Sequence, residues 1–212
     1  MKIFLVRIFF TYLLGFPNIR FFFYFSLIFF VSCSSVFTDE DEVSISPRPR
    51  GYVRIEFPNR EYTRWNDSSC PFSFEIPVYA YMSVKDSVNC WWNLNFARFK
   101  AILHISYKFL QKDSLSKVIE DCRTLAIRHQ IKAMGMEEIP VIRDSSRVYG
   151  LIYQIKGNTA SNLQFYITDS VTHFLRGSLY FNVYPNYDSI LPVLEFIQQD
   201  VVRLIKSTRW RK

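Results

Sequence analysis

Three histidines and four cysteines are the residues of this 212-residue chain with the most specific chemistry, because both types can bind metals and take part in catalysis. His104 falls on the polar face of a predicted strand, His129 on a predicted helical stripe, and His173 shortly after Asp169. No histidine pair has the spacing of a metal site, and no Cys-x-x-Cys pattern occurs. The sequence also lacks a Gly-x-Ser-x-Gly element, a phosphate loop and a glycine-rich nucleotide turn. We therefore predict structural histidines, with no metal, no cofactor and no catalytic centre.

Cys70 and Cys90 each open a strand-like run, CPFSFEIP and CWWNLNF. Disulfides persist in exported proteins, and pairing these two closes a loop of about 20 residues, worth roughly 3 kcal/mol in the chain-entropy model. Cys122 instead falls on an apolar stripe with helical spacing, where it acts as a small hydrophobe. We predict a Cys70–Cys90 disulfide and a free, buried Cys122.

Cys33 stands where the composition changes from apolar to polar. Phe21–Val31 is an uncharged apolar run of 11 residues after Arg20, and a serine separates it from the cysteine. This pattern indicates a secretory signal, since a membrane-spanning helix needs about 20 apolar residues. The cysteine resembles that of the bacterial lipobox, although Phe30 stands where leucine is usual. We predict that residues 1–32 are a lipoprotein signal peptide with an N-terminal extension and that Cys33 is acylated, with palmitate among its acyl chains. A plain signal peptide and an uncleaved anchor are the alternatives.

Residues 33–50 are polar, contain the acidic run Asp39 to Glu42 and show no sustained periodicity, as a flexible lipid-anchored linker would. The acidic run also resembles the signals that send some lipoproteins to the cell exterior. The formal net charge of +7 contains no basic run interleaved with aromatic residues. We therefore predict no nucleic-acid partner.

Alternating and helical patterns predict a single α+β domain over residues 51–208, followed by a basic tail at 209–212. One helix is expected from Asp113 or Ser114 to about Ala133, and another after a cap at Asp188 or Ser189. The order favours a largely antiparallel sheet with the two main helices packed on one face, and it also resembles the PsbP-like α/β/α sandwich. The predicted strands are 52–57, 72–76, 78–84, 91–96, 101–109, 139–143, 148–155, 162–168 and 174–183.

One face of the predicted sheet is a lattice of tyrosine, asparagine, glutamine and arginine, which alternate with apolar residues along the last two strands. Tyrosine and arginine are enriched where proteins bind proteins. The same pattern also fits a half-wet sheet face, or a face covered by the N-terminal strands. The candidate partner-binding residues are Gln164, Tyr166, Arg176, Tyr180, Asn182 and Tyr184.

The segment PRPRGYVRIEFP, Pro47 to Pro58, resembles the GldD family of gliding-motility lipoproteins. The resemblance extends in order to about Lys206, over essentially the whole predicted domain. Further matching stretches are Cys70–Pro71, Phe74–Pro77, Cys90–Trp91, Arg123–Leu125, Val148–Gly150, Gly157–Asn158, Ala160–Ser161, Gln164–Phe165, His173–Gly177 and Leu179–Asn182.

This resemblance implies an outer-membrane lipoprotein that is needed for gliding and linked to type IX secretion. It implies lipidation of Cys33 and matches Cys70 and Cys90 to the family's cysteines, and it brings no catalytic or metal residues. The expected partners are the membrane, through the lipid on Cys33, and other gliding and secretion proteins of the envelope. We expect a non-enzymatic scaffold. The alternative is an envelope enzyme or ligand-binding module for cell-wall or glycan material, which a cleft with His129 or His173 beside a carboxylate would favour.

Overall fold

The computed structural model describes residues 54–110, 115–128 and 133–211. The chain divides into two units, residues 1–51 and 52–212, and the described residues all belong to the second. Cys33, the predicted linker of residues 33–50 and His129 lie outside the described residues.

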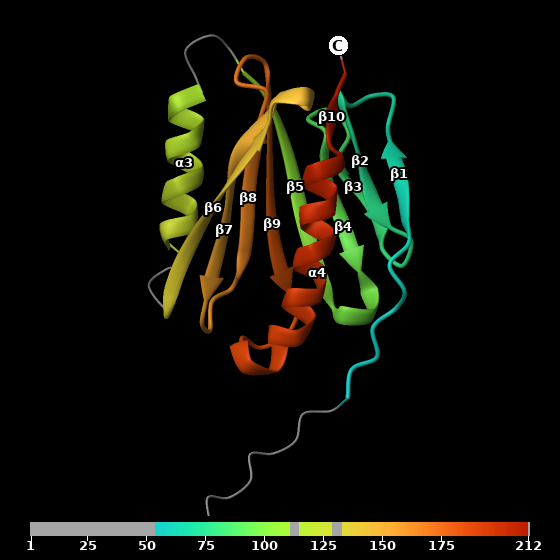
Figure 1. Cartoon of the computed structure of the whole chain (residues 1–212), viewed down its shortest axis with the longest axis vertical. Helices are drawn as coiled ribbons and strands as arrows, with labels where there is room; N and C mark the ends of the chain where they lie inside the picture. Colours follow the sequence, from blue (N-terminus) through green and yellow to red (C-terminus); the bar gives the residue numbers. More distant parts are fainter. Residues whose placement is uncertain (1–53, 111–114, 129–132, 212) are drawn as a thin grey trace, which may run out of the picture. The chain divides into compact units, whose positions relative to one another are not determined.

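The described residues form two antiparallel sheets (Figure 1). The larger sheet has the strand order β3-β4-β5-β9-β8-β7-β6, and the smaller one has the order β1-β2-β10. The smaller sheet comprises β1 (Tyr62–Asn66), β2 (Phe72–Pro77) and β10 (Arg209–Trp210). The larger sheet comprises β3 (Tyr81–Asp86), β4 (Trp91–Phe96), β5 (Ala101–Phe109), β6 (Gly135–Arg143), β7 (Val148–Lys156), β8 (Leu163–Thr168) and β9 (His173–Phe181).

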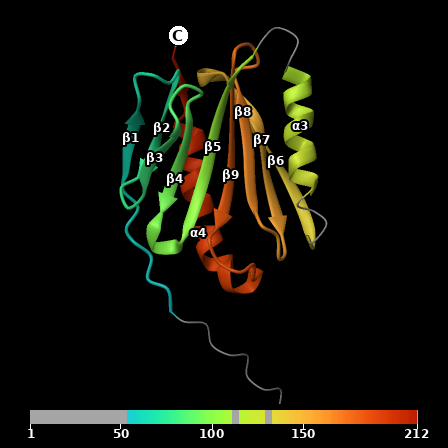
Figure 2. The same cartoon turned by 180° about the vertical axis from the view of Figure 1, so that it is seen from behind.

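The main core lies between the larger sheet and helix α4 (Tyr187–Ser207), with the smaller sheet at its side. Figure 2 shows the strands of the larger sheet in front of this helix. The buried residues of α4 recur every three or four positions and so form one apolar stripe. They include Leu194, Ile197, Val201 and Leu204. Full burial of each such side chain stabilises the fold by about 1.5–3 kcal/mol. The Asn186 side chain accepts a hydrogen bond from the Ser189 N–H, which places the cap shortly before the predicted one.

Helix α3 (Leu115–Arg128) packs on the opposite face of the larger sheet through Val118, Cys122 and Ala126. These residues contact a second apolar cluster that contains Tyr166, whereas Phe165, the preceding residue of β8, packs in the main core. Because consecutive strand residues point to opposite faces, the two helices lie on opposite sides of the sheet. The α+β class is confirmed, but the expectation that both helices pack on one face is wrong. Helical periodicity identifies the buried stripe, and it does not identify the sheet face that receives it.

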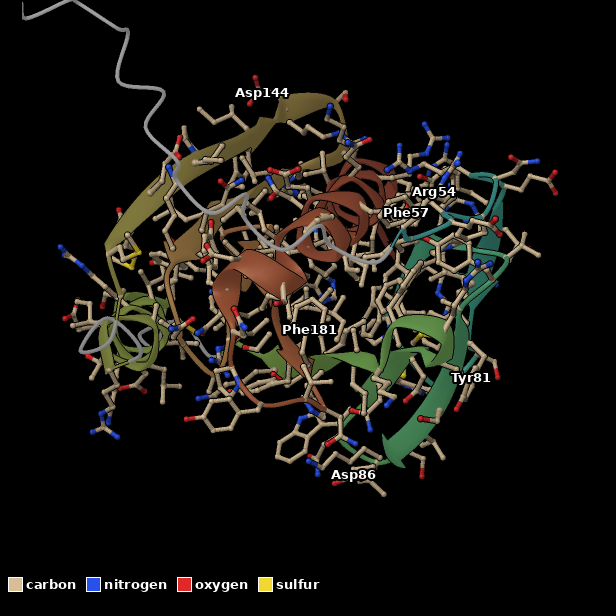
Figure 3. The ribbon with its side chains drawn as sticks, turned by 90° about the horizontal axis from the view of Figure 1, so that it is seen from below. Arg54, Phe57, Tyr81, Asp86, Asp144 and Phe181 are labelled. Carbon is tan, nitrogen blue, oxygen red and sulfur yellow. A yellow bond between two sulfur atoms is a disulfide. The ribbon has the colours of Figure 1, made fainter. Side chains whose placement is uncertain are left out.

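Two segments differ from the sequence prediction. Residues 54–57 of the predicted first strand are not in a strand, and β1 begins only at Tyr62. Phe57 instead stacks on Phe196 of α4 with ring centroids 4.4 Å apart (Figure 3). The predicted basic tail is also corrected, because Arg209 and Trp210 form β10 and pair with Ser73 and Phe72.

Candidate functional site

On the face of the larger sheet that α3 packs against, the helix contacts residues of β7, β8 and β9 and leaves the side of β3 and β4 uncovered. There β3, β4, β5 and β9 present the side chains that alternate with those of the main core. Tyr81 lies on the outer side of the sheet, away from α4 (Figure 3). We call this surface the open face, and its members are Tyr81, Ser83, Asn93, Asn95, Ile102, His104, Ser106 and Tyr180.

Neighbouring side chains hold the open face in place. Asn95 Nδ2 donates to Ser83 Oγ at 2.8 Å, and His104 Nδ1 lies 2.7 Å from Asn93 Oδ1. The Tyr180 ring meets the His104 ring edge-on, with centroids 5.4 Å apart. Burial lowers the pKa of His104, so its imidazole is neutral at neutral pH. The open face therefore offers neutral polar groups and aromatic edges, the chemistry of many protein–protein contacts.

Two of the residues predicted to bind partners are covered by α3. Gln164 and Tyr166 are 2% and 6% exposed. Tyr166 stacks on Phe174 with centroids 5.4 Å apart, and Gln164 Oε1 accepts a hydrogen bond from Arg176 at 3.0 Å. Placing Gln164 and Tyr166 on a binding surface is therefore wrong. Strand alternation shows that they share a face with the polar lattice, but it does not show which part of that face a helix covers.

The other four predicted residues divide into two pairs. Tyr180 lies on the open face, and the partly buried Arg176 lies two residues before the buried Ser178 on β9. Asn182 and Tyr184 follow the end of β9 and are exposed, Tyr184 to 90%. The exposed polar face therefore excludes the residues of β8 and includes residues of β3, β4 and β5. Polar and apolar residues alternate along those three strands too, so the sequence contained the signal for them.

The cysteines take two different positions among the described residues. Cys70 and Cys90 form a disulfide with their Cα atoms 5.7 Å apart, which joins the start of β2 to the start of β4 and so links the two sheets. Cys122 is a free thiol in the cluster under α3, and burial raises its pKa to about 11. A thiol with this pKa is protonated and unreactive at neutral pH.

A cavity of about 970 Å³ lies where the ends of β5, β6 and β10 meet the β8–β9 turn. This is the end of the domain that carries the C-terminus (Figure 1). We call it the end cavity, and its lining includes Tyr107, Arg147, Asp169, His173, Arg209 and Trp210.

The end cavity contains the histidine and carboxylate that the enzyme alternative requires, but each has another role. His173 Nδ1 lies 2.9 Å from the Tyr107 hydroxyl oxygen, and the His173 ring stacks on Trp210 at 5.2 Å. Asp169 Oδ1 accepts the backbone N–H groups of Val171, Thr172 and His173 within 3.0 Å. Burial raises the pKa of Asp169, but these hydrogen bonds outweigh it and leave the pKa below its usual value. Asp169 therefore caps the hairpin instead of orienting His173 as a base.

Asp200 is a buried acid that the sequence analysis missed. Its carboxylate accepts hydrogen bonds from the hydroxyls of Tyr62, at 2.8 Å, and of Tyr79, and the Arg60 guanidinium lies 3.7 Å away. Burial is the largest effect on the pKa of Asp200 and raises it despite these partners. The sequence did contain a sign of this buried acid. Asp200 comes directly before Val201 on the apolar stripe of α4, where a charge must be paired.

Neither a metal cluster nor a spanning helix is found in the described part of the chain. No group of three or more histidine, cysteine or acidic residues there could hold a metal ion. The helices among the described residues are too short or too polar to cross a membrane.

The sequence profile described as gliding motility lipoprotein GldD matches residues 42–210, which is most of the chain. The chain belongs to the GldD family. Membership associates it with gliding motility and, as a lipoprotein, with the cell envelope. The match begins after Cys33, so it covers the described domain and not the predicted lipidation site.

Solved structures that resemble this GldD-family chain include one from a cyanobacterium. The solution structure of cyanobacterial PsbP (CyanoP) from Synechocystis sp. PCC 6803 is similar, with a TM-score of 0.45 and 13% identity. The similarity covers 74% of this chain and 97% of that one. A comparison with the curated proteins finds no match.

Proposed function

We propose that this chain is an outer-membrane lipoprotein that assembles gliding and type IX secretion proteins through its open face, without catalysing a reaction. Cys33 carries the lipid that holds it to the membrane. Membership of the GldD family supports the link to gliding and the envelope. The membrane, the secretion partners and the scaffold role are our inferences from that membership and from the open face.

The open face is the observation that carries the scaffold role. Its side chains come from four strands and are positioned by one another, so a partner would bind them at little ordering cost. Tyr81 is 57% exposed and lies near one end of this surface, where it can serve as an aromatic anchor.

The rival class is an envelope enzyme or a ligand-binding module for cell-wall or glycan material. Its specific support is the end cavity with His173 and Asp169. The Asp169 carboxylate is engaged by the hairpin N–H groups, and His173 is engaged by Tyr107 and Trp210. These contacts favour the scaffold over the enzyme.

Photocrosslinking in intact gliding cells tests the scaffold role. We would replace Tyr81 with benzoylphenylalanine, which carries a photoreactive benzoyl group on the ring in place of the tyrosine hydroxyl, and irradiate the cells. A matched control would replace Ile142, which is 71% exposed on β6 at the other edge of the sheet. We expect the Tyr81 probe, and not the Ile142 probe, to form an adduct with a gliding or type IX secretion protein identified by mass spectrometry.

A functional measurement accompanies the crosslink. Tyr81→Ala combined with Tyr180→Ala should abolish gliding while the protein stays at its normal level. Normal gliding with this double variant, or equal adducts from both probes, would remove the open face as the partner surface.

The anchor is tested separately with Cys33→Ser. We expect this variant to lose the acylated N-terminus in mass spectrometry and to leave the outer-membrane fraction. An outer-membrane protein with an unmodified Cys33 would contradict the proposed anchor.

A further inference from the structure

β10 leaves one edge of the smaller sheet unpaired among the described strands, and this edge borders the end cavity. The Arg211 N–H donates to the Pro71 carbonyl oxygen at 2.9 Å. In an antiparallel pair, alternate residues bond to the neighbouring strand. Arg209 and Arg211 therefore bond to β2, and the N–H and C=O of Trp210 point toward the free edge.

The same edge is positively charged. Arg147 and Arg209 are exposed, and no hydrogen bond or ion pair of the described residues engages their guanidinium groups. Arg211 adds a third charge. Its guanidinium donates to the main-chain carbonyls of Asp67 and Cys70 and also interacts electrostatically with the Asp67 carboxylate. Among the described lining residues the acid is Asp169, which is already bound by the hairpin N–H groups. Burial lowers the pKa of His173, so the positive charge comes from the arginines.

The walls of the end cavity are fixed by contacts that exist without a ligand. The Trp210 indole N–H donates to the Arg147 carbonyl oxygen at 2.9 Å, and the Trp210 ring stacks on His173 at an angle of 10°. Phe109 and Val171 at the cavity are 63% and 56% exposed, so they can contact apolar side chains of a ligand. A ligand would bind this site with little reorganisation.

We propose that the end cavity binds an extended acidic peptide segment of a partner protein, which adds a strand to the free edge of β10 and places carboxylates against Arg147 and Arg209. Arginine pairs with carboxylate through two parallel hydrogen bonds, and strand addition supplies main-chain bonds. A lipid headgroup or an inorganic anion could meet the arginines but has no main chain to pair with Trp210.

The end cavity lies at the end of the domain that carries the C-terminus (Figure 1). The site is distinct from the open face, so either proposal can fail while the other holds.

Fluorescence anisotropy with the full-length chain in detergent tests the proposal. The probe is a labelled peptide of three alternating Glu-Val pairs, and the matched peptide has Gln in place of Glu. The test variant is Arg147→Ala with Arg209→Ala. The control is Arg98→Ala, which removes an exposed arginine from the β4–β5 connection.

We expect the Glu-Val peptide to bind the wild-type chain and to lose about tenfold in affinity on the double variant, as two solvent-exposed ion pairs would give. Arg98→Ala should bind like the wild type, and the Gln-Val peptide should bind about tenfold more weakly. If the double variant unfolds, the Glu-Val and Gln-Val comparison on the wild-type chain decides the charge requirement.

A peptide methylated on every backbone nitrogen keeps its charge but cannot donate main-chain hydrogen bonds, so it should bind at least tenfold more weakly. Equal binding of this peptide would overturn strand addition. Equal binding to the double variant, or displacement by inorganic phosphate at the peptide's own concentration, would overturn the peptide site.

Two further outcomes would name a different occupant and also overturn the proposal. The first is binding of phosphatidylglycerol vesicles, lost in the double variant, without binding of the peptide. The second is binding of the probe only after Asp39, Glu40, Asp41 and Glu42 are all replaced by their amides. That result would show that the chain's own acidic run fills the cavity.

Discussion

Replacing Tyr79 with phenylalanine tests whether Asp200 fastens α4 to the N-terminal part of the domain. Asp200 is 1% exposed, and its two tyrosine partners lie 121 and 138 residues earlier in the sequence. The Tyr79 ring also packs near Phe196 of α4, with centroids 5.8 Å apart. Phenylalanine keeps this packing and removes only the hydroxyl, so the variant isolates the hydrogen bond.

The expected cost follows from the charge and burial of the pair. A hydrogen bond to a charged group contributes about 1.5–3 kcal/mol, and Tyr79 is partly buried, so water does not fully replace it. We expect Tyr79→Phe to lower the free energy of unfolding by about 2 kcal/mol. For a domain of this size that corresponds to a fall in Tm of roughly 6 °C.

Urea unfolding of a double-mutant cycle measures the interaction itself. In the Asp200→Asn background the lost bond joins two neutral groups, so Tyr79→Phe should cost only about 1 kcal/mol there. Tyr184→Phe, at a side chain that is 90% exposed, is the control and should change nothing. A cost below about 0.5 kcal/mol for Tyr79→Phe in both backgrounds would refute the role assigned to Asp200.

Four further predictions follow from the described contacts. Replacing Cys70 and Cys90 with serine should lower the free energy of unfolding by about 3 kcal/mol, since the disulfide closes a separation of 20 residues; urea titration with no change on reduction of the wild type would contradict this. Gly150→Ala should destabilise by about 1–3 kcal/mol, because its Cβ would lie 1.9 Å from the Tyr166 carbonyl oxygen, whereas Gly135→Ala, with nothing within 4 Å, is the control. Folding raises the pKa of Asp200 above the unfolded value of about 3.9, so the folded state binds this proton more tightly. The free energy of unfolding of the wild type, relative to that of Asp200→Asn, should therefore fall as pH rises from below 4 through the raised pKa. A rise over this range would contradict the prediction. Iodoacetamide should leave Cys122 unmodified in the native chain and label it after unfolding, because burial raises its pKa to about 11; native labelling at pH 8 would exclude the buried thiol.

The sequence predicted those elements well in which apolar residues recur with the period of a strand or a helix and form one buried face. β4, β5 and the β7–β8–β9 meander were predicted nearly to their ends, because apolar and polar residues alternate along them. β1 was missed because its residues, YTRWN, are mostly exposed and show no apolar alternation. β10 was missed because two residues paired to a distant strand leave no local pattern.

The candidate sites could be predicted from the sequence even less completely than the strands. Alternation places Gln164, Tyr166 and Tyr180 on one face, and only the path of α3 decides that the first two are covered and the third is not. The Asp200 cluster depends on tyrosines far away in the sequence, so single-residue patterns can mark the acid but cannot name its partners. The cover by α3 and the partners of Asp200 both depend on tertiary packing, and the spacing of apolar residues along the chain contains no information about it.

The position of α3 bears directly on how a small domain could act as a scaffold. By covering β7 and β8, α3 gives the larger sheet a second buried layer there and leaves the polar side of β3, β4 and β5 exposed. The disulfide joins the smaller sheet to β4, so the free edge of β10 is held at a fixed position relative to the open face. If both surfaces bind, one rigid body holds two partners in a defined geometry, which requires that each surface take its own partner. A chain in which the open-face and end-cavity variants each remove a different partner would meet this requirement.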